Sequence, residues 1–357
     1  MKKFLVWFLL AAMFLGLCGC ASEANPPETT EVETTTAETQ TAAEETDPPV
    51  LEENLFLKVS SITFSLVGES EDIYLGLVPR ELVTWESEDP SVVSVENGVL
   101  TANGVGTTTI HATYYDRQMT CTAGCLAETQ EELDSLDPTV LSAPKRMPPE
   151  VDMEEPCTYF DNAAIIGDSV TYFLWQSESQ NNYLGDLLFV TRQGISILGL
   201  VQRYKNLYFE GREMYIEDIA AQCKADRIYL ALGCLDFQFE AGRDSLMDSW
   251  NTMLDRIAEK SPDLEVVIIS NIPSFTEKTT SLEINDFIAE NNVQLRKLAA
   301  DKGYGFLDLG YYIQDHYGRM PAIYSKDDYH MNAEGSLAWM RIMRYYAQYE
   351  HEGGTLS

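Results

Sequence analysis

The feature that most constrains the fold is a series of short apolar runs that alternate with longer amphipathic stretches after Asn162. The apolar runs are 163–166, 187–190, 227–232, 266–269 and 305–308, and the amphipathic stretches are 243–260, 281–302 and 332–348. Continuous apolar runs are typical of strands buried on both faces of a parallel sheet, and the amphipathic stretches have the period of helices. The alternation therefore predicts a three-layer α/β/α domain with a parallel sheet over 159–350, followed by a short tail, 351–357.

The region 54–125 has a different texture. Its apolar residues alternate, as in 62–66, and no helical period appears. Asn97-Gly98 and Asn103-Gly104 are hairpin signals. These features predict a small β-sandwich, which makes the chain a multi-domain protein. The following segment, 126–158, is rich in acidic residues and proline, and we interpret it as a linker, part of which can pack on the next domain.

Three stretches of the β region resemble a known domain. They are Val83-Thr84-Trp85-Glu86-Ser87-Glu88-Asp89-Pro90-Ser91-Val92-Val93-Ser94-Val95, Asn97-Gly98-Val99-Leu100 and Gly104-Val105-Gly106-Thr107-Thr108-Thr109-Ile110. Together they resemble the bacterial Ig-like domain, group 2. The resemblance implies an Ig-like β-sandwich that acts as a spacer or an adhesion module, and we favour the spacer. It also implies that Trp85 is a core residue.

The N-terminus has the pattern of an export signal. Lys2 and Lys3 precede the apolar run 4–17, which is too short to span a membrane comfortably. The run ends in Leu17-Cys18-Gly19-Cys20, which resembles the lipobox of bacterial lipoproteins. The resemblance implies a signal peptide over 1–20 and lipidation of Cys20, so we expect a cell-surface protein anchored to the membrane by lipid alone. A plain secretory signal cut elsewhere is the alternative.

The segment 21–53 contains ten acidic residues, no Lys or Arg, and almost no large apolar side chain. Such a composition cannot form a core, so it predicts a disordered acidic tether. The formal net charge of the whole chain is −33, which argues against nucleic acid as a partner. Of the seven cysteines, Cys18 and Cys20 lie in the signal. Five remain, an odd number, and we expect mostly buried thiols.

The first apolar run of the α/β region ends in Gly167-Asp168-Ser169. A strand that breaks here and enters a helix places the serine hydroxyl at the carboxyl edge of the sheet, beside backbone N–H groups that stabilise an anion. A serine nucleophile needs a base. His330 follows Asp327 by three residues just before a predicted helix, whereas we interpret the segment around His316 as surface and that around His351 as a polar tail.

Each of these two motifs alone has a structural explanation, because Gly-Asp-Ser is also a common turn with a helix cap. Their positions make the pair informative. Ser169 stands at the first strand–helix junction of the domain, and Asp327 and His330 stand before its last helix. The order Ser, Asp, His is one of those that catalytic triads use. We therefore predict Ser169, Asp327 and His330 as the catalytic residues.

The two blocks resemble the first and last signature blocks of the SGNH/GDSL hydrolases, and the resemblance spans about 160–348. It implies a flavodoxin-like fold and ester hydrolysis through an acyl-enzyme without a cofactor or a metal. In that mechanism Ser169 attacks, His330 is the base and Asp327 orients it. The resemblance also implies an oxyanion site built from the N–H groups of Ser169 and of a glycine, for which Gly194 is our candidate, and from an Asn side chain.

The third block departs from the family, because Leu232-Gly233-Cys234-Leu235-Asp236 has leucine where the family has Asn. Losing one oxyanion donor costs roughly 10²–10³ in rate, and Gln193 or Gln238 are possible substitutes. The leading hypothesis is a serine esterase that removes acyl groups, acetyl above all, from carbohydrate or cell-envelope substrates without an obligate protein partner. Lipids and the acyl groups of peptidoglycan are further candidate substrates. The alternatives are an acyltransferase on the same triad and a catalytically weakened glycan-binding module.

Overall fold

The computed structural model describes residues 55–76, 78–275 and 279–351. The predicted signal peptide, the lipidation site at Cys20, the acidic tether and the end of the tail lie outside the described residues. Within the described ranges, no helix is both long and apolar enough to cross a membrane.

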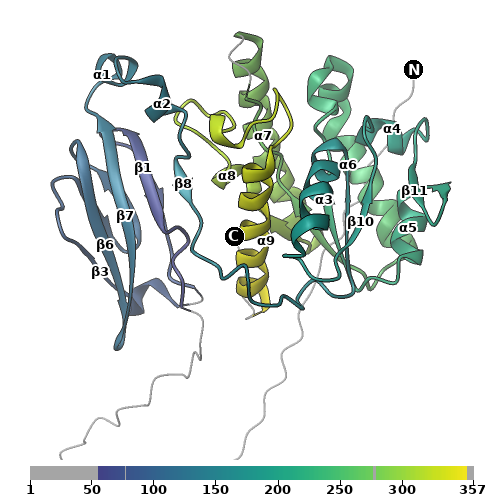
Figure 1. The fold of residues 1–357 in the computed structure, drawn as a ribbon, viewed down its shortest axis with the longest axis horizontal. Coiled ribbons are helices and arrows are strands. Elements are labelled where there is room, and N and C mark those ends of the chain that lie inside the picture. The colour runs from purple at the N-terminus through teal and green to yellow at the C-terminus, as the bar shows by residue number, and fades with distance from the viewer. Residues whose placement is uncertain (1–54, 77, 276–278, 352–357) are drawn as a thin grey trace, which may run out of the picture. The chain divides into compact units, whose positions relative to one another are not determined.

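The C-terminal part is an α/β domain built on a parallel sheet (Figure 1). Its strand order is β10-β9-β13-β14-β15. The strands are β9 (Ala163–Gly167), β10 (Leu188–Thr191), β13 (Arg227–Ala231), β14 (Glu265–Ile269) and β15 (Gly305–Leu307). The parallel sheet agrees with the prediction from the apolar runs.

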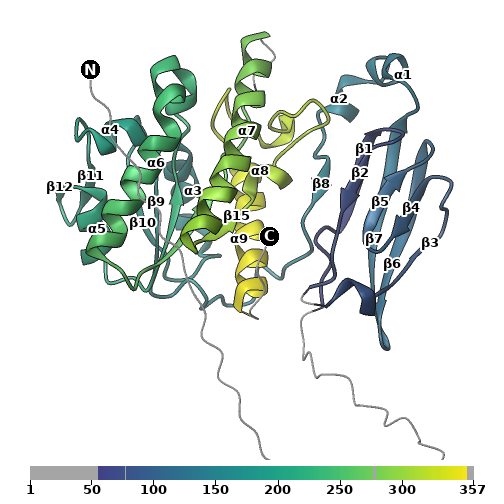
Figure 2. The ribbon, with the colours of Figure 1, turned by 180° about the vertical axis from the view of Figure 1, so that it is seen from behind.

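Helices cover both faces of this sheet, as Figures 1 and 2 show from opposite sides. They are α3 (Ser169–Asn181), α4 (Ile197–Val201), α5 (Ile216–Gln222), α6 (Glu240–Lys260), α7 (Thr279–Lys302), α8 (Leu309–Tyr312) and α9 (Ala333–His351). Neighbouring strand residues point to opposite faces: Ile165 packs in one core with Leu174 of α3 and Trp339 of α9. Ile166 packs in a second core with Trp250 of α6 and Leu295 of α7. The sheet therefore lies between two layers of helices, with one core on each of its faces.

Smaller elements complete the α/β domain. They are the hairpin β11 (Leu207–Phe209) and β12 (Arg212–Met214), and the 3₁₀ turns η2 (Asp236–Gln238) and η3 (Ala322–Tyr324). The η2 turn directly follows the loop that leaves β13, at the same edge of the sheet as the start of α3. The η3 turn precedes the loop that carries His330.

The N-terminal part is a β domain with two sheets. Their orders are β3-β6-β7-β1-β8 and β2-β5-β4, where β1 pairs with β7 in parallel. The strands are β1 (Ser61–Leu66), β2 (Ser70–Asp72), β3 (Thr84–Ser87), β4 (Val93–Glu96), β5 (Val99–Ala102), β6 (Gly106–Tyr114), β7 (Arg117–Ala127) and β8 (Arg146–Met147), with a 3₁₀ turn η1 (Arg80–Leu82). Ile62, Leu100 and Ile110 are fully buried between them. The relation of this domain to bacterial Ig-like domains stays a prediction.

The segment 126–158 is not the plain linker that its composition suggests. It contains α1 (Gln130–Asp134), α2 (Pro138–Leu141) and β8, and β8 pairs with β1. Thr129 and Glu132 form a reciprocal capping box at the start of α1. Asp137 caps α2 ahead of Pro138. These local helix signals stand among acidic residues and are easily mistaken for loop composition.

The segment around His316 is also different from the surface loop that we expected. Ile313 and Asp315 are buried, and His316 Nδ1 lies 3.0 Å from Ser65 Oγ of the β domain. The β domain covers a segment that its polar sequence suggested would face water. Burial and the nearby Lys145 lower the pKa of His316 to about 4, so this imidazole is neutral at physiological pH.

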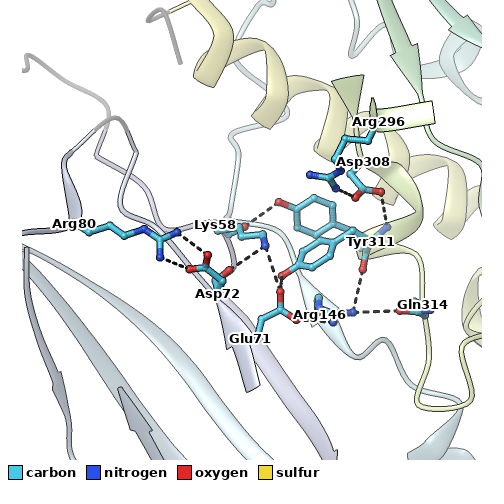
Figure 3. Close-up of polar contacts among 10 residues, drawn as sticks. Lys58, Glu71, Asp72, Arg80, Arg146, Arg296, Asp308, Tyr311 and Gln314 are labelled. Atoms are coloured by element: carbon cyan, nitrogen blue, oxygen red, sulfur yellow. Dashed lines mark hydrogen bonds and ion pairs between the residues drawn. The ribbon is translucent and has the colours of Figure 1, made fainter. Parts of the chain in front are cut away.

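A partly buried polar cluster joins the β domain to the α/β domain (Figure 3). Glu71 accepts hydrogen bonds from Lys58 Nζ at 3.3 Å, Arg146 Nη2 at 2.7 Å and Tyr311 Oη at 3.0 Å. Arg146 also donates to Gln314 Oε1 at 3.3 Å. Burial raises the pKa of Glu71, but Arg146 and Lys58 outweigh burial, and the net pKa is lowered. The carboxylate thus stays ionised and bound to groups of both domains.

We expect Glu71→Gln to destabilise the protein by about 1–3 kcal/mol, because one amide oxygen must replace two carboxylate oxygens that hold charged donors. The measurement is the midpoint of thermal unfolding at neutral pH. Glu81→Gln, on an exposed residue of η1, is the matched control and should leave the midpoint unchanged. Equal midpoints for Glu71→Gln and the unmodified protein would show that the cluster is not stabilising.

Candidate active site

The turn from β9 into α3 positions Ser169. Asp168 caps the helix, and its Oδ1 accepts the N–H of Val170 at 3.0 Å. Gly167 is required by the tight packing of this turn, because a Cβ there would lie 2.0 Å from Thr171 Oγ1. Ser169 is therefore the first helical residue, at the carboxyl end of β9, as the sequence pattern predicts.

The structure brings Ser169, His330 and Asp327 into one hydrogen-bonded line. Ser169 Oγ lies 2.9 Å from His330 Nε2. On the other side of the ring, His330 Nδ1 lies 2.9 Å from both carboxylate oxygens of Asp327. Residues 161 positions apart thus meet within hydrogen-bond distance.

Asp327 is held in place by its own loop. Its Oδ1 accepts the backbone N–H groups of Tyr329 at 3.0 Å and His330 at 2.9 Å. Partial burial raises the pKa of Asp327, but these hydrogen bonds and the His330 ring outweigh burial and lower it. An ionised carboxylate keeps the imidazole proton on Nδ1, which leaves Nε2 free to accept the proton of Ser169.

The His330 ring also has an aromatic neighbour on α3. The rings of Phe173 and His330 meet edge to face, with their centroids 4.9 Å apart. Lys326 Nζ lies 3.5 Å from the centroid of the Phe173 ring, and the Lys326 N–H donates to the His330 carbonyl at 2.8 Å. These contacts fix the plane of the imidazole in addition to its tautomer. Sequence reasoning missed Phe173, although its spacing of four residues from Ser169 is the signal that could have found it.

The loop after β13 is fastened to the nucleophile turn. The N–H of Cys234 donates to Asp168 Oδ2 at 3.0 Å. Leu235 therefore directly follows a residue that is bonded to Asp168, the chain neighbour of Ser169. Gln238 Nε2 donates to the Cys234 carbonyl at 3.3 Å, which occupies the side chain of one proposed substitute donor. Burial raises the pKa of the Cys234 thiol well above its usual value, so this cysteine stays protonated.

Gly194, our candidate for an oxyanion N–H, lies in the loop that follows β10 with a φ of +66°. A glycine adopts this left-handed conformation without strain. Its carbonyl accepts a hydrogen bond from Lys205 Nζ at 2.7 Å, and Lys205 also donates to the carbonyl of Gln193 at 3.3 Å. The loop is thus fixed at the carboxyl edge of the sheet, on the strand next to β9.

Asp236 ties together two of the loops at this edge, a role that the sequence did not reveal. Its carboxylate accepts the N–H of Ile197 at 2.9 Å and that of Leu198 at 3.2 Å, at the start of α4. Burial raises the pKa of Asp236 to about 6 and also that of Asp168 to about 6. Between pH values of about 4 and 6, these two carboxyl groups therefore bind protons more tightly in the folded protein than in the unfolded chain.

This difference predicts that the contribution of these two groups to the free energy of unfolding falls as pH rises through that range. In Asp236→Asn one of the titrating groups is absent, so the fall between about pH 4.5 and about pH 7.5 should be smaller. Denaturant unfolding at the two pH values measures it. Asp116→Asn, at an exposed turn residue, is the control and should keep the slope of the unmodified protein. If the free energy of unfolding of Asp236→Asn changes with pH as steeply as that of the unmodified protein, the raised pKa is wrongly assigned to Asp236.

A small cavity of about 30 Å³ lies against Asp168 and Val170, the two chain neighbours of Ser169. The loop after β14 forms one wall, and two asparagines of α7 hold that loop. Asn292 exchanges two hydrogen bonds, both 2.8 Å, with the backbone of Asn271. Asn285 does the same with Ser274, at 2.7 and 3.0 Å. Ser274 Oγ also donates to the Asp328 carbonyl at 2.9 Å, which links this wall to the loop of His330.

Comparison with known proteins agrees with this geometry. Residues 165–338 match the model of the GDSL-like lipase/acylhydrolase family. This match implies an ester hydrolase in general terms, and we refer to the α/β domain as the GDSL-like domain. Among curated proteins, none matches the chain.

Several solved structures resemble the GDSL-like domain. A Streptococcus pneumonia protein provisionally described as a platelet activating factor has 18% identity, a TM-score of 0.43, and covers 56% of this chain and 86% of its own. The C-terminal catalytic domain of Streptococcus pneumoniae peptidoglycan O-acetyltransferase A has 12% identity and a TM-score of 0.38, and the match covers 53% of this chain and 94% of that domain. An acetyl xylan esterase has 16% identity and a TM-score of 0.39, and the match covers 52% of this chain and 98% of the esterase. These scores are too low to transfer an activity.

The five described cysteines, Cys121, Cys125, Cys157, Cys223 and Cys234, are free thiols. Cys121 and Cys125 are buried in the β domain, whereas the other three are partly exposed, so the expectation of mostly buried thiols holds for two of the five. In the part of the chain that the structure describes, no group of three or more His, Cys, Asp or Glu side chains is arranged to hold a metal ion.

Proposed function

We propose that this protein is a serine esterase that removes short acyl groups, acetyl above all, from carbohydrate or cell-envelope substrates. The observation that carries the proposal is the hydrogen-bonded line from Ser169 through His330 to Asp327 at the carboxyl edge of the sheet. The serine, its base and the group that orients the base all have the geometry that acyl transfer requires.

In the acylation step, Ser169 Oγ attacks the ester carbonyl carbon while His330 Nε2 takes the hydroxyl proton. The Ser169 N–H, at the start of α3, faces the developing oxyanion and stabilises it. The intermediate collapses when the bond from carbon to the alcohol oxygen breaks, and His330 gives its proton to that oxygen. The alcohol leaves, and the acyl group remains on Ser169.

In the deacylation step, a water molecule attacks the acyl carbonyl and His330 takes one of its protons. The bond to Ser169 Oγ then breaks, the proton returns to the serine, and the carboxylic acid leaves. Asp327 stays ionised through both steps, because its lowered pKa favours the carboxylate beside the imidazolium that forms transiently.

The proposal includes a location. The lipobox-like Leu17-Cys18-Gly19-Cys20 supports export and attachment of lipid to Cys20, and the acidic segment 21–53 would space the folded domains from the membrane. The membrane contact is then through lipid alone, and the substrate lies outside the cytoplasm. The β domain would serve as a spacer that is fixed to the enzyme through the Glu71 cluster.

A fluorophosphonate probe tests the central proposal, because it reacts with serines that are activated by a base. We expect covalent labelling that peptide mapping places at Ser169 and that His330→Gln abolishes. A natively folded protein without labelling would favour the glycan-binding module, in which the triad is inert.

Leu235 favours a second candidate, an acyltransferase on the same triad, because a weak oxyanion site is compatible with slow attack by water. In that case a sugar hydroxyl takes the place of water in the second step. Product analysis with an acetyl ester and a sugar acceptor distinguishes the two: free acetate indicates the esterase, and an acetylated acceptor indicates the transferase.

A further inference from the structure

The role of His330 fixes where the alcohol part of an ester substrate must lie. The alcohol oxygen has to come within hydrogen-bond distance of His330 Nε2 to receive its proton. The surface next to the His330 ring therefore faces the alcohol portion of the substrate. The side chains on this surface decide which alcohols fit.

Three aromatic side chains of α3 form a continuous surface that begins at this ring. Phe173 contacts His330, with centroids 4.9 Å apart. Tyr172 contacts Phe173 at 5.7 Å and Trp175 at 5.6 Å. Tyr172 and Phe173 follow Ser169 by three and four residues, so these two lie on the helical face of Ser169, and Trp175 extends the surface through its contact with Tyr172. We call Tyr172, Phe173 and Trp175 the aromatic shelf.

The aromatic shelf is partly open to solvent, and polar groups lie beside Tyr172 and over Phe173. Trp175 is 41% exposed, and the side chains of Tyr172 and Phe173 are half-buried. Gln176 Nε2 donates to Tyr172 Oη at 3.4 Å, and Lys326 Nζ lies over the Phe173 ring. Aromatic residues in mutual contact that remain exposed on a helix beside a nucleophile contribute little to the core, and such patches are typical of binding surfaces.

We propose that the aromatic shelf binds the pyranose ring of an acylated carbohydrate and presents its ester to Ser169. This inference rests on the proposed esterase function and names the alcohol part of its substrate. One face of a pyranose carries mainly C–H groups, which pack on aromatic rings, while its rim carries hydroxyls that bind amide and ammonium groups such as those of Gln176 and Lys326. The mixture of aromatic rings and adjacent polar groups fits a sugar better than a long alkyl chain.

The test compares two acetate esters that differ only in the alcohol: an acetylated methyl pyranoside and ethyl acetate. We expect Trp175→Ala to lower kcat/KM for the pyranoside acetate about 10-fold, mainly through KM, because aromatic stacking of this size corresponds to that factor. The value for ethyl acetate should change less than about twofold. Trp175→Phe keeps a ring and should retain most of the activity. Tyr115→Ala, in the β6–β7 turn and 57% exposed, is the control and should change neither substrate.

Equal losses on both esters, or no loss on either, would overturn the proposal. So would a loss that appears with dodecyl acetate and not with the pyranoside acetate, because the shelf would then bind an alkyl chain. Binding to Ser169→Ala, measured by isothermal titration calorimetry, separates this proposal from the proposed function. If the unmodified protein hydrolyses no ester, the proposed esterase function is wrong. The proposal for the aromatic shelf is still supported if adding Trp175→Ala to Ser169→Ala weakens binding of the acetylated pyranoside about 10-fold. Unchanged binding would refute it.

Discussion

Ser169→Ala should lower kcat for an acetyl ester by about 10⁴-fold or more, with KM nearly unchanged. The alanine removes the oxygen that attacks the carbonyl, while Asp168 still caps α3 and the hydrogen bond from Cys234 to Asp168 remains. Substrate binding, the helix start and the His330 loop therefore stay intact. Initial rates with a chromogenic acetyl ester, over a range of substrate concentrations, separate the effect on kcat from that on KM.

Ser179→Ala is the matched control for this prediction. Ser179 lies on the same helix, is exposed, and its hydroxyl donates to the Gln176 carbonyl at 2.9 Å. Its replacement should leave kcat within about twofold of the unmodified protein, because surface substitutions of this kind change little. If Ser169→Ala and Ser179→Ala hydrolyse the ester equally fast, Ser169 is not the nucleophile.

The second large effect is a gain. Leu235→Asn should raise kcat by about 10²-fold, because a leucine side chain donates no hydrogen bond and one oxyanion donor is worth roughly that factor. Leu235 follows Cys234, whose N–H is held by Asp168 beside the nucleophile. An amide at this position is thus introduced on a fixed loop beside the turn that carries Ser169.

Leu235→Asp distinguishes a hydrogen-bond donor from a mere change of size. The aspartate has the shape of asparagine but carries negative charge, so we expect it to lower kcat below that of the unmodified protein. The rise in Leu235→Asn should vanish when it is combined with Ser169→Ala. A kcat for Leu235→Asn at or below the original value would mean that residue 235 does not face the oxyanion.

The parts of the site that could be predicted are those determined by neighbours in sequence. The turn at Gly167-Asp168-Ser169 depends on a buried strand, a cap and a helix that are all local. Asp327 and His330 are three residues apart, so their contact is almost guaranteed once the loop bends. The parallel sheet followed from runs that are apolar on every residue, which only burial on both faces explains.

The parts that could not be predicted depend on residues that meet only in the folded chain. Asn285 and Asn292 hold the loop after β14 from a helix that begins several residues later, and nothing in their local sequence marks them. The clamp from Asp236 to Ile197 spans 39 residues. Burial of the segment around His316 requires the β domain, which a reading of that segment alone does not include.

The pairing of β8 with β1 has a consequence for how the two halves of the chain could be separated. The Lys145 carbonyl and both backbone groups of Met147 cover β1 on the side away from β7. A fragment cut after residue 125 would lack this cover, and the N–H and C=O groups along β1 would be left without partners. Unpaired strands of this kind recruit other chains, so such a fragment should self-associate into β-rich aggregates, whereas one that continues through residue 147 should remain monomeric.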